Sequence, residues 1–128
     1  MTRAVVTTGS ATPMEVEIEG RTMTFDLGES TGGTGAAPTS TEGVSASLAA
    51  CTVGTLRVYA DRKGWDLEGL TVSVDTEYDG PVPSFFDVTV GIPDRFDEDQ
   101  AARLMVIAAK CPVHKILCGA TDVRVKKA

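Results

Sequence analysis

The sequence carries no excess of positive charge. Its 12 Lys and Arg residues are outnumbered by 18 Asp and Glu residues, which gives a net charge of −6. A nucleic-acid-binding surface needs clustered basic side chains to meet the phosphates, but the basic residues here are scattered apart from the short tail Arg124-Val125-Lys126-Lys127. We therefore expect no nucleic-acid partner.

The sequence also lacks long hydrophobic runs. No segment reaches the roughly 20 apolar residues of a membrane span, and residues 1–8 contain no apolar stretch followed by a cleavage site of small residues. These features predict a cytoplasmic protein with no membrane partner. Its three cysteines, an odd number, do not suggest a secreted disulfide framework. In a reducing compartment such cysteines are buried small residues, metal ligands or reactive thiols.

Several catalytic motifs are missing as well. There is no Gly-x-Ser-x-Gly motif, and a single histidine would have to serve any serine-based triad. The loop 28–38 is rich in Gly, Ser and Thr but lacks the Gly-Lys-Ser/Thr ending of a P-loop. The carboxylates around Asp97 complement the start of a helix and form no acid/base pair. We expect no cofactor.

What is present predicts one folded domain over residues 1–128, because 42% of the residues are hydrophobic and the chain is long enough to bury a core without disulfides or metal. Alternating apolar residues predict strands, and apolar residues at helical spacing between capping residues predict helices. The predicted strands are Ala4–Thr8, Met14–Glu19, Thr22–Leu27, Leu70–Tyr78, Phe86–Ile92 and Thr121–Val125, and the predicted helices are 39–62, 101–110 and 112–118. The fold class is α+β, in the order β-β-β-α-β-β-α-α-β.

The long helix 39–62 begins with Thr39 and Glu42, which have the spacing of a capping box. One stripe along it is predicted to face inward, which places Cys51 in the middle of the helix on a packed face. Small residues on the other positions permit another backbone to approach, so we expect this helix to be central. The stripe consists of Val44, Leu48, Cys51, Thr55 and Tyr59; with Met105 and Val106 it would line an apolar approach to the Cys51 sulfur.

Cys111 precedes Pro112, which fits the first position of a new helix with Cys111 as its cap. A thiol at a helix N-terminus near His114 is disposed to ionise. The spacing of Cys111, His114 and Cys118 also fits metal ligands, with Cys51 as a fourth. Structural zinc usually uses Cys-x-x-Cys pairs from turns, so we predict no metal. The simplest structural roles are core packing for Cys51 and Cys118 and capping or packing for His114.

Five segments together resemble the OsmC/Ohr family, most nearly its short OsmC-like (YhfA-type) branch. They are Gly32-Gly33-x-Gly35 with Pro38, Glu42 at the helix start, Leu48-Ala49-Ala50-Cys51-Thr52, Tyr59-Ala60-x-x-Lys63-Gly64, and Cys111-Pro112-Val113-His114-Lys115. The resemblance implies an intertwined homodimer with sites at the subunit interface. It also implies a thiol peroxidase in which Cys51 attacks an organic hydroperoxide and Cys111 resolves the sulfenic acid as a disulfide. A dithiol of lipoyl type or a small thiol would then reduce that disulfide.

In the hydroperoxidase members of that family, a Glu ten residues before the first Cys and an Arg from the N-terminal strands activate the site. Here Thr41 is ten residues before Cys51 and Glu42 is nine, and the early arginines are Arg3 and Arg21. By the resemblance, Glu42 joins Cys51 and Cys111 as a catalytic residue, and Leu48, Thr55, Tyr59 and Met105 contact the substrate. A second hypothesis stays open, in which the same fold binds a small molecule or thiol compound in an apolar interface cavity without peroxidase activity.

Overall fold

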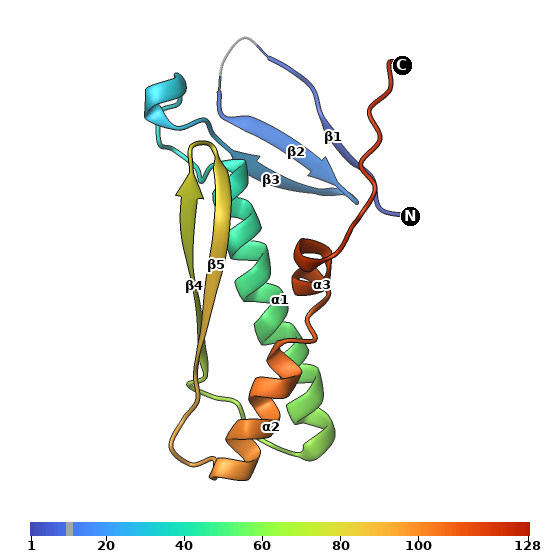
Figure 1. The fold of residues 1–128 in the computed structure, drawn as a ribbon. Helices are drawn as coiled ribbons and strands as arrows, with labels where there is room; N and C mark the ends of the chain where they lie inside the picture. Colours follow the sequence, from blue (N-terminus) through green and yellow to red (C-terminus); the bar gives the residue numbers. More distant parts are fainter. Residues whose placement is uncertain (10–11) are drawn as a thin grey trace. The chain divides into compact units, whose positions relative to one another are not determined.

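The computed structural model describes residues 1–9 and 12–128, which divide into an N-terminal unit, Met1–Val44, and a C-terminal unit, Ser45–Ala128. Strands and helices come in separate runs along the chain, in the mixed α+β arrangement that the sequence predicts (Figure 1). The elements are β1 (Ala4–Val6), β2 (Met14–Ile18), β3 (Arg21–Phe25), the 3-10 helix η1 (Glu29–Thr31), α1 (Ser40–Lys63), β4 (Thr71–Asp79), β5 (Val82–Gly91), α2 (Glu98–Ala108) and α3 (Pro112–Cys118).

The three strands of the N-terminal unit form one antiparallel sheet in the order β1-β2-β3. A tight turn joins β2 to β3, where Ile18 pairs with Arg21 and both turn residues, Glu19 and Gly20, have positive φ angles of 48° and 74°. Glycine takes this conformation without steric cost, which explains the Gly in the predicted hairpin.

The glycine-rich loop after β3 is fixed by Asp26, whose side chain is only 1% exposed. Its carboxylate accepts hydrogen bonds from the Leu27 amide at 2.8 Å and from the Thr34 amide and hydroxyl at 3.0 and 2.8 Å. The hydroxyl of Thr34, followed by its amide, lowers the pKa of Asp26 to about 2. Gly33 is required in this loop because a Cβ there would overlap the Leu27 carbonyl.

Helix α1 starts and stops where the sequence predicts. At its start, the Thr39 hydroxyl accepts a hydrogen bond from the Glu42 amide at 3.2 Å, the first half of the predicted capping box. At its end, Gly64 takes a positive φ of 69°, the conformation in which helices commonly terminate. No helix in the described part of the chain is both long and apolar enough to cross a membrane.

The predicted inward stripe of α1 is wrong by one position. The buried residues are Leu48, Thr52, Leu56 and Ala60, which recur every four residues. Cys51, Thr55 and Tyr59 lie beside this row and are half-buried. Pattern reading missed the row because Thr52 is polar, yet its hydroxyl donates to the Leu48 carbonyl at 2.8 Å and so loses little on burial.

Strands β4 and β5 form a long antiparallel hairpin, as predicted. Asp79 pairs with Val82, so Gly80 and Pro81 make a two-residue turn, and Gly80 has a φ of 61°. Alternate residues of both strands are half-buried, which gives the hairpin one packed face.

The core of the C-terminal unit lies between α1, α2 and this hairpin. Helix α2 begins at the predicted capping box, in which Asp97 and Gln100 exchange side-chain and backbone hydrogen bonds of 2.8 and 3.0 Å. Leu56 and Leu104 are completely buried, and packing one such side chain contributes about 1.5–3 kcal/mol. The buried cluster is Leu56, Ala60, Leu67, Leu104, Ile107 and Ala108, with Trp65, Val72 and Val90 among the side chains packed against it.

The predicted last strand, Thr121–Val125, is absent. Helix α3 ends at Gly119 as predicted, but the residues that follow have no regular structure, and no strand in the described part of the chain pairs with them. Val123 and Val125 are 86% and 96% exposed. An isolated strand has no partner for its backbone hydrogen bonds, so an alternating pattern alone does not create one.

We predict that Asp26→Asn lowers the stability of the protein near neutral pH, because Asn presents a donor as well as an acceptor to the two Thr34 donors. The folded pKa of about 2 lies below the value of an unfolded Asp, so the carboxylate stabilises the fold above about pH 4 and loses this effect as the pH falls toward 2. Urea midpoints measured against pH should therefore converge for wild type and variant at the acid end. A gap independent of pH would contradict this role for Asp26.

Candidate functional site

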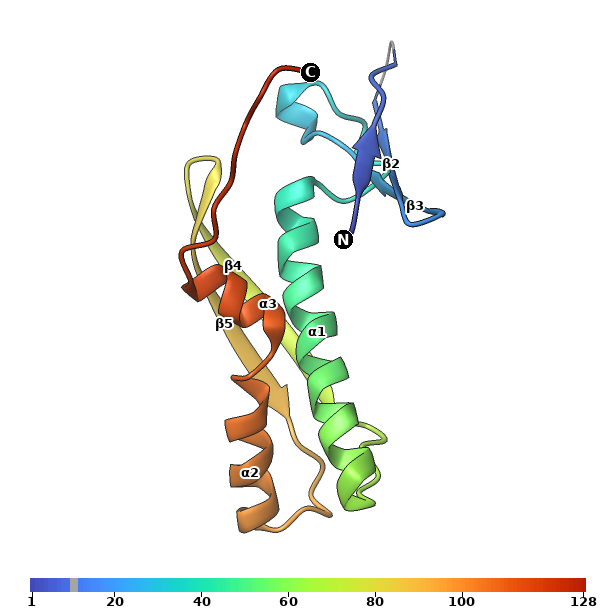
Figure 2. The ribbon, with the colours of Figure 1, turned by 90° about the vertical axis from the view of Figure 1, so that its right-hand side faces the viewer.

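The two cysteines singled out by the sequence meet in the C-terminal unit. Cys51 lies midway along α1 and Cys111 directly precedes α3, and the two thiols lie close enough that each shifts the pKa of the other. Cys51 is half-buried, whereas Cys111 is fully buried, with an exposed fraction of 0%. In Figures 1 and 2, α2 runs beside the C-terminal half of α1, and the short α3 begins where α2 has ended. The chain therefore returns to α1 at the level of Cys51.

Cys111 is held by its role as the cap of α3. Its backbone angles, φ −58° and ψ 136°, lie outside the helix, and its sulfur accepts a hydrogen bond from the His114 amide at 3.4 Å. Pro112 occupies the first helical position, where the missing amide hydrogen costs nothing. The amides of Val113 and His114 thus have no acceptor within α3, and the His114 amide donates to the Cys111 sulfur instead.

The surroundings shift the pKa values of the two thiols in opposite directions. Burial, followed by the hydrogen bond with Cys111, raises the pKa of the Cys51 thiol. Burial also pushes the pKa of Cys111 upward, but hydrogen bonds from Cys51 and from the His114 and Val113 amides outweigh it, so the pKa of Cys111 is lowered. The Val113 amide lies near both sulfurs and acts to lower the pKa of Cys51 as well.

An open pocket of about 620 Å³ lies in front of Cys51. Its wall is mostly apolar, with two cationic side chains, Arg62 and Lys110. Tyr59 is fixed there by Arg103, whose Nε donates to the Tyr59 hydroxyl at 3.1 Å and whose guanidinium lies 5.6 Å from the ring centre. The pocket is lined by Cys51, Gly54, Thr55, Val58, Tyr59, Arg62, Ile107, Lys110 and Pro112.

The structure brings together only part of the predicted substrate site. Thr55 and Tyr59 line the Cys51 pocket, whereas Leu48 is 3% exposed and belongs to the buried row of α1. Met105 lines a separate pocket of about 240 Å³, whose wall includes Thr52 and His114. Of the predicted substrate contacts, Thr55 and Tyr59 line the pocket of Cys51, and these two residues are one helical turn apart on α1.

The predicted activating groups belong to the N-terminal unit. Glu42 is exposed in the first turn of α1. Arg3 is exposed directly before β1, and Arg21 is exposed as the first residue of β3. The Arg3 backbone amide donates to the Glu19 carboxylate at 2.9 Å.

Pattern reading missed Val58, Arg62 and Lys110. Val58 and Arg62 are 7 and 11 positions after Cys51, which is the spacing of one helix face. The sequence therefore places them on the side of α1 that carries Cys51, and the structure shows that this side lines a pocket. Lys110 directly precedes Cys111 and had no spacing signal, because its place beside α1 depends on how α2 packs.

The alternative metal site would need the side chains of Cys51, Cys111, His114 and Cys118 to converge. Cys118 is exposed near the end of α3, while Cys51 and Cys111 form a pair. Across residues 1–9 and 12–128, no three His, Cys, Asp or Glu side chains converge as metal ligands would.

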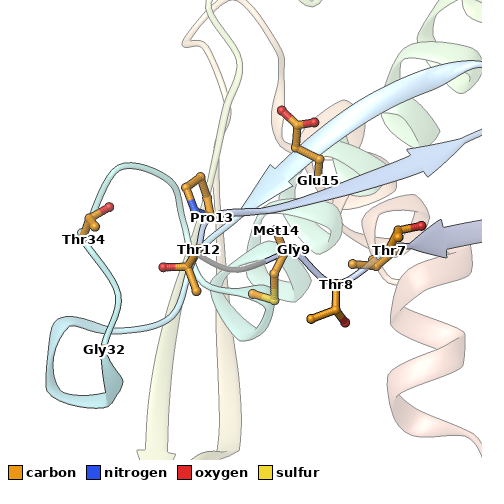
Figure 3. Close-up of a pocket in the computed structure, with 10 residues that line it drawn as sticks. Thr7, Thr8, Gly9, Thr12, Pro13, Met14, Glu15, Gly32 and Thr34 are labelled. Carbon is orange, nitrogen blue, oxygen red and sulfur yellow. The ribbon is translucent and has the colours of Figure 1, made fainter.

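A second hollow, of about 840 Å³, lies in the N-terminal unit (Figure 3). Thr7, Thr8 and Thr12 line it from the β1–β2 segment, and Thr34 lines it from the loop after η1. Glu15 is the one titratable side chain among its described lining residues. This hollow offers hydroxyl groups and no thiol, so the chemistry of the cysteines belongs to the pocket in the C-terminal unit.

The chain is similar to one protein family and to a set of solved structures. Residues 33–126 match the family model described as OsmC-like protein, and 25 chains of solved structures match the chain. No curated protein sequence is a match.

Three of the matching structures illustrate the likeness. A protein of Psychrobacter arcticus, described in terms of an osmotic stress and detoxification response, has a TM-score of 0.81 at 22% identity, covering 91% of this chain and 88% of that one. An OsmC like protein from Mycoplasma pneumoniae has a TM-score of 0.78 at 16% identity, covering 93% and 88%. The organic hydroperoxide resistance protein OsmC from Legionella pneumophila has a TM-score of 0.65 at 21% identity, covering 93% and 90%.

The contact between the two sulfurs predicts their chemical pairing. Treatment with diamide should produce a Cys51–Cys111 disulfide, because the two thiols are close enough to shift each other's pKa, and should leave the exposed Cys118 available to a thiol reagent. Peptide mapping under non-reducing conditions identifies the bridge. Cys118→Ser is the matched control and should give the same bridge, whereas a Cys111–Cys118 bridge would contradict the geometry.

Proposed function

The chain belongs to the OsmC-like protein family, and we propose that it is a thiol-dependent peroxidase that reduces organic hydroperoxides. The single observation that carries this proposal is the pair of neighbouring thiols, Cys51 and Cys111, at the wall of an apolar pocket. One thiol faces the pocket and the other is buried behind it, which is the arrangement that a two-cysteine peroxidase needs.

In the first step, the Cys51 sulfur attacks the distal oxygen of the hydroperoxide. The O–O bond breaks, the alkoxide takes a proton to become an alcohol, and Cys51 becomes a sulfenic acid. Cys51 is the thiol suited to this role because its side chain lines the pocket, whereas Cys111 has no exposed surface.

In the second step, the Cys111 sulfur attacks the Cys51 sulfur, hydroxide leaves as water after taking a proton, and a disulfide forms. The two thiols lie close together, so this step needs little movement. An external dithiol of lipoyl type, or a small thiol, then reduces the disulfide by exchange and restores both cysteines.

The pocket favours a bulky substrate over hydrogen peroxide. Val58, Ile107 and Pro112 offer apolar surface that hydrogen peroxide cannot use. At about 25 cal/mol per Å², burying roughly 60 Å² of an alkyl or aryl group is worth a factor of about ten.

We also propose that the protein works as a homodimer. The tail 121–125 alternates like a strand but leaves Val123 and Val125 exposed, and Val58 on the pocket face of α1 is 54% exposed. A second copy that paired with the tail or covered this face would bury apolar surface and supply the backbone partners that an unpaired strand lacks.

One observation favours the alternative function, a binding protein for a small molecule or thiol compound. Burial raises the pKa of Cys51, which reduces the fraction of its reactive thiolate at neutral pH. Under this alternative, the apolar pocket holds a ligand and the cysteines perform no turnover.

We predict that the protein consumes cumene hydroperoxide with dihydrolipoamide as reductant, at least about tenfold faster than it consumes hydrogen peroxide, because of the apolar wall. Cys51→Ser should abolish turnover, because Cys51 is the thiol that lines the pocket. Coupled spectroscopic assays of peroxide loss measure both effects.

The exposed Cys118 provides the control, because Cys118→Ser should keep the wild-type rate. Two results together would replace the peroxidase with the binding function. The wild type would turn over neither peroxide but would bind an apolar dye, and Val58→Asp would weaken that binding.

Light scattering is expected to give a mass of about twice the 13.4 kDa of one chain at micromolar concentration. Val123→Asp with Val125→Asp should weaken the dimer, because two charges replace apolar contacts in the tail, whereas the matched pair Val123→Thr and Val125→Thr keeps strand propensity. A stable 13.4 kDa wild-type species would refute the dimer.

A further inference from the structure

Two cationic side chains in the wall of the Cys51 pocket have no carboxylate to neutralise them. Arg62 and Lys110 line this pocket of about 620 Å³, and no acidic side chain does. In the part of the chain that the structure describes, the one ion pair joins two residues of the C-terminal tail, so neither pocket cation takes part in it. The chain as a whole has a net charge of −6, so a pocket with two positive charges is a local site of attraction for anions.

The end of the pocket remote from Cys51 also offers a hydrogen-bond donor. Cys51 and Arg62 are 11 residues apart on one face of α1, which is about 16 Å along the helix axis. Tyr59, one turn before Arg62, lines the pocket, and its hydroxyl oxygen accepts a hydrogen bond from Arg103 at 3.1 Å. The proton of this hydroxyl is therefore left for another acceptor. An acidic group at this end can bind the Arg62 guanidinium and accept from Tyr59.

The proposed cycle brings one organic anion to this pocket. The hydroperoxide is neutral, and the apolar wall is enough to bind its alkyl or aryl group. The reductant, in contrast, attacks the disulfide as a thiolate. Cys111 has an exposed fraction of 0%, whereas Cys51 lines the pocket. The reductant must therefore attack the Cys51 sulfur, and it must enter past Arg62 and Lys110 to do so.

From these contacts we infer that the reductant of this site is an acidic thiol, whose carboxylate binds Arg62 and whose thiolate attacks the Cys51 sulfur. Lys110 directly precedes Cys111 in the chain and supplies positive charge at the thiol end of the pocket. This inference rests on the proposed function and names the chemical class of its second substrate.

With a dithiol, the exchange balances in two steps. The first thiolate of the reductant forms a bond to the Cys51 sulfur, the Cys51–Cys111 bond breaks, and the Cys111 sulfur leaves as a thiolate and takes up a proton. The second thiolate then attacks the reductant's own sulfur in the mixed disulfide, and the Cys51 sulfur leaves and takes up the second proton. The reductant loses two electrons and two protons, and the protein gains both.

The test compares two reductants that differ only in charge, dihydrolipoate with its carboxylate and dihydrolipoamide with a neutral amide. The disulfide is made with diamide in Cys118→Ser protein, so that no peroxide chemistry is needed, and its reduction is followed by mass spectrometry of quenched samples. Dihydrolipoate should react about tenfold faster at low ionic strength, as one hydrogen bond between charged groups allows. This advantage should shrink as salt is added. Equal rates would overturn the inference.

Variants of the cations test whether the pocket sets this preference. Arg62 and Lys110 are both exposed, so Arg62→Met and Lys110→Met should fold, and each should lower the ratio of the two rates. Arg62→Lys should keep most of the ratio, because the positive charge stays. Lys126→Met is the matched control, since it removes one positive charge from the tail, outside the pocket lining. A ratio that fell as much in Lys126→Met would assign the preference to net charge and overturn the inference.

A second probe reads the charge of the pocket without any disulfide in the protein. In the variant with Cys111→Ser and Cys118→Ser, Cys51 is the one remaining thiol. Its reaction with the dianionic reagent dithiobis(nitrobenzoate) is compared with its reaction with neutral dithiodipyridine, each relative to a free thiol. The anionic reagent should be favoured severalfold, and Arg62→Met should reduce this preference. A preference for the neutral reagent would contradict an anion-binding pocket.

The outcomes separate this inference from the proposed function. A protein that prefers dihydrolipoate and the dianionic reagent but turns over no peroxide would refute the peroxidase and leave the selection of acidic thiols intact. A protein that turns over cumene hydroperoxide but reduces equally fast with both dithiols would keep the peroxidase and refute the inference. If a hydroperoxide bearing a carboxylate outran its methyl ester while the two dithiols reacted equally, the cations would select the peroxide instead, and the inference would be wrong.

Discussion

Burial of the Leu56 face of α1 is the constraint on which the rest of the C-terminal unit depends. Leu56 and Ala60 have no exposed surface, and they pack with Leu104 and Ile107 of α2 beside the hairpin. Once this face is buried, the angular position of every other residue of α1 is fixed, because helix neighbours are 100° apart. Cys51 therefore comes to the margin of the core, where it touches the buried Cys111 on one side and the open pocket on the other.

The same packing makes the electrostatics of the two thiols unequal. Cys111 is fully buried and Cys51 is half-buried, and burial alone would raise both pKa values. The Cys111 sulfur also accepts a hydrogen bond from the His114 amide at 3.4 Å, because Cys111 is the cap of α3, whereas the Val113 amide lies near both thiols. A helix start that caps itself with a thiol therefore anchors α3 and lowers the pKa of that thiol.

The likeness to the Psychrobacter, Legionella and Mycoplasma structures concerns the fold, because the sequence identities are only 16 to 22%. A shared fold supports many chemistries, so function must be argued from the site. In this chain, the site contains a thiol pair and an apolar wall bearing two cations, Arg62 and Lys110. Those cations arise from α1 and from the end of α2, and their presence near Cys51 is a property of this sequence that fold likeness does not supply.

Local sequence chemistry determined the elements and their ends. Thr39 and Asp97 mark helix starts, Gly64 and Gly119 mark helix ends, and alternation marks five of the six predicted strands. These features depend on neighbours a few residues apart, which the sequence displays directly. The cysteine at the α3 cap was predictable for the same reason.

Tertiary packing decided the rest. It chose the buried row of α1, since Thr52 becomes acceptable inside only when its hydroxyl bonds the Leu48 carbonyl, and it left the alternating tail 121–125 without a strand partner. It also brought Lys110 to the pocket and Cys111 to Cys51 across 60 residues of chain. The sequence by itself therefore determined which thiols could react, while the three-dimensional contacts decided which of them is reached from the pocket, because access depends on residues distant in the chain.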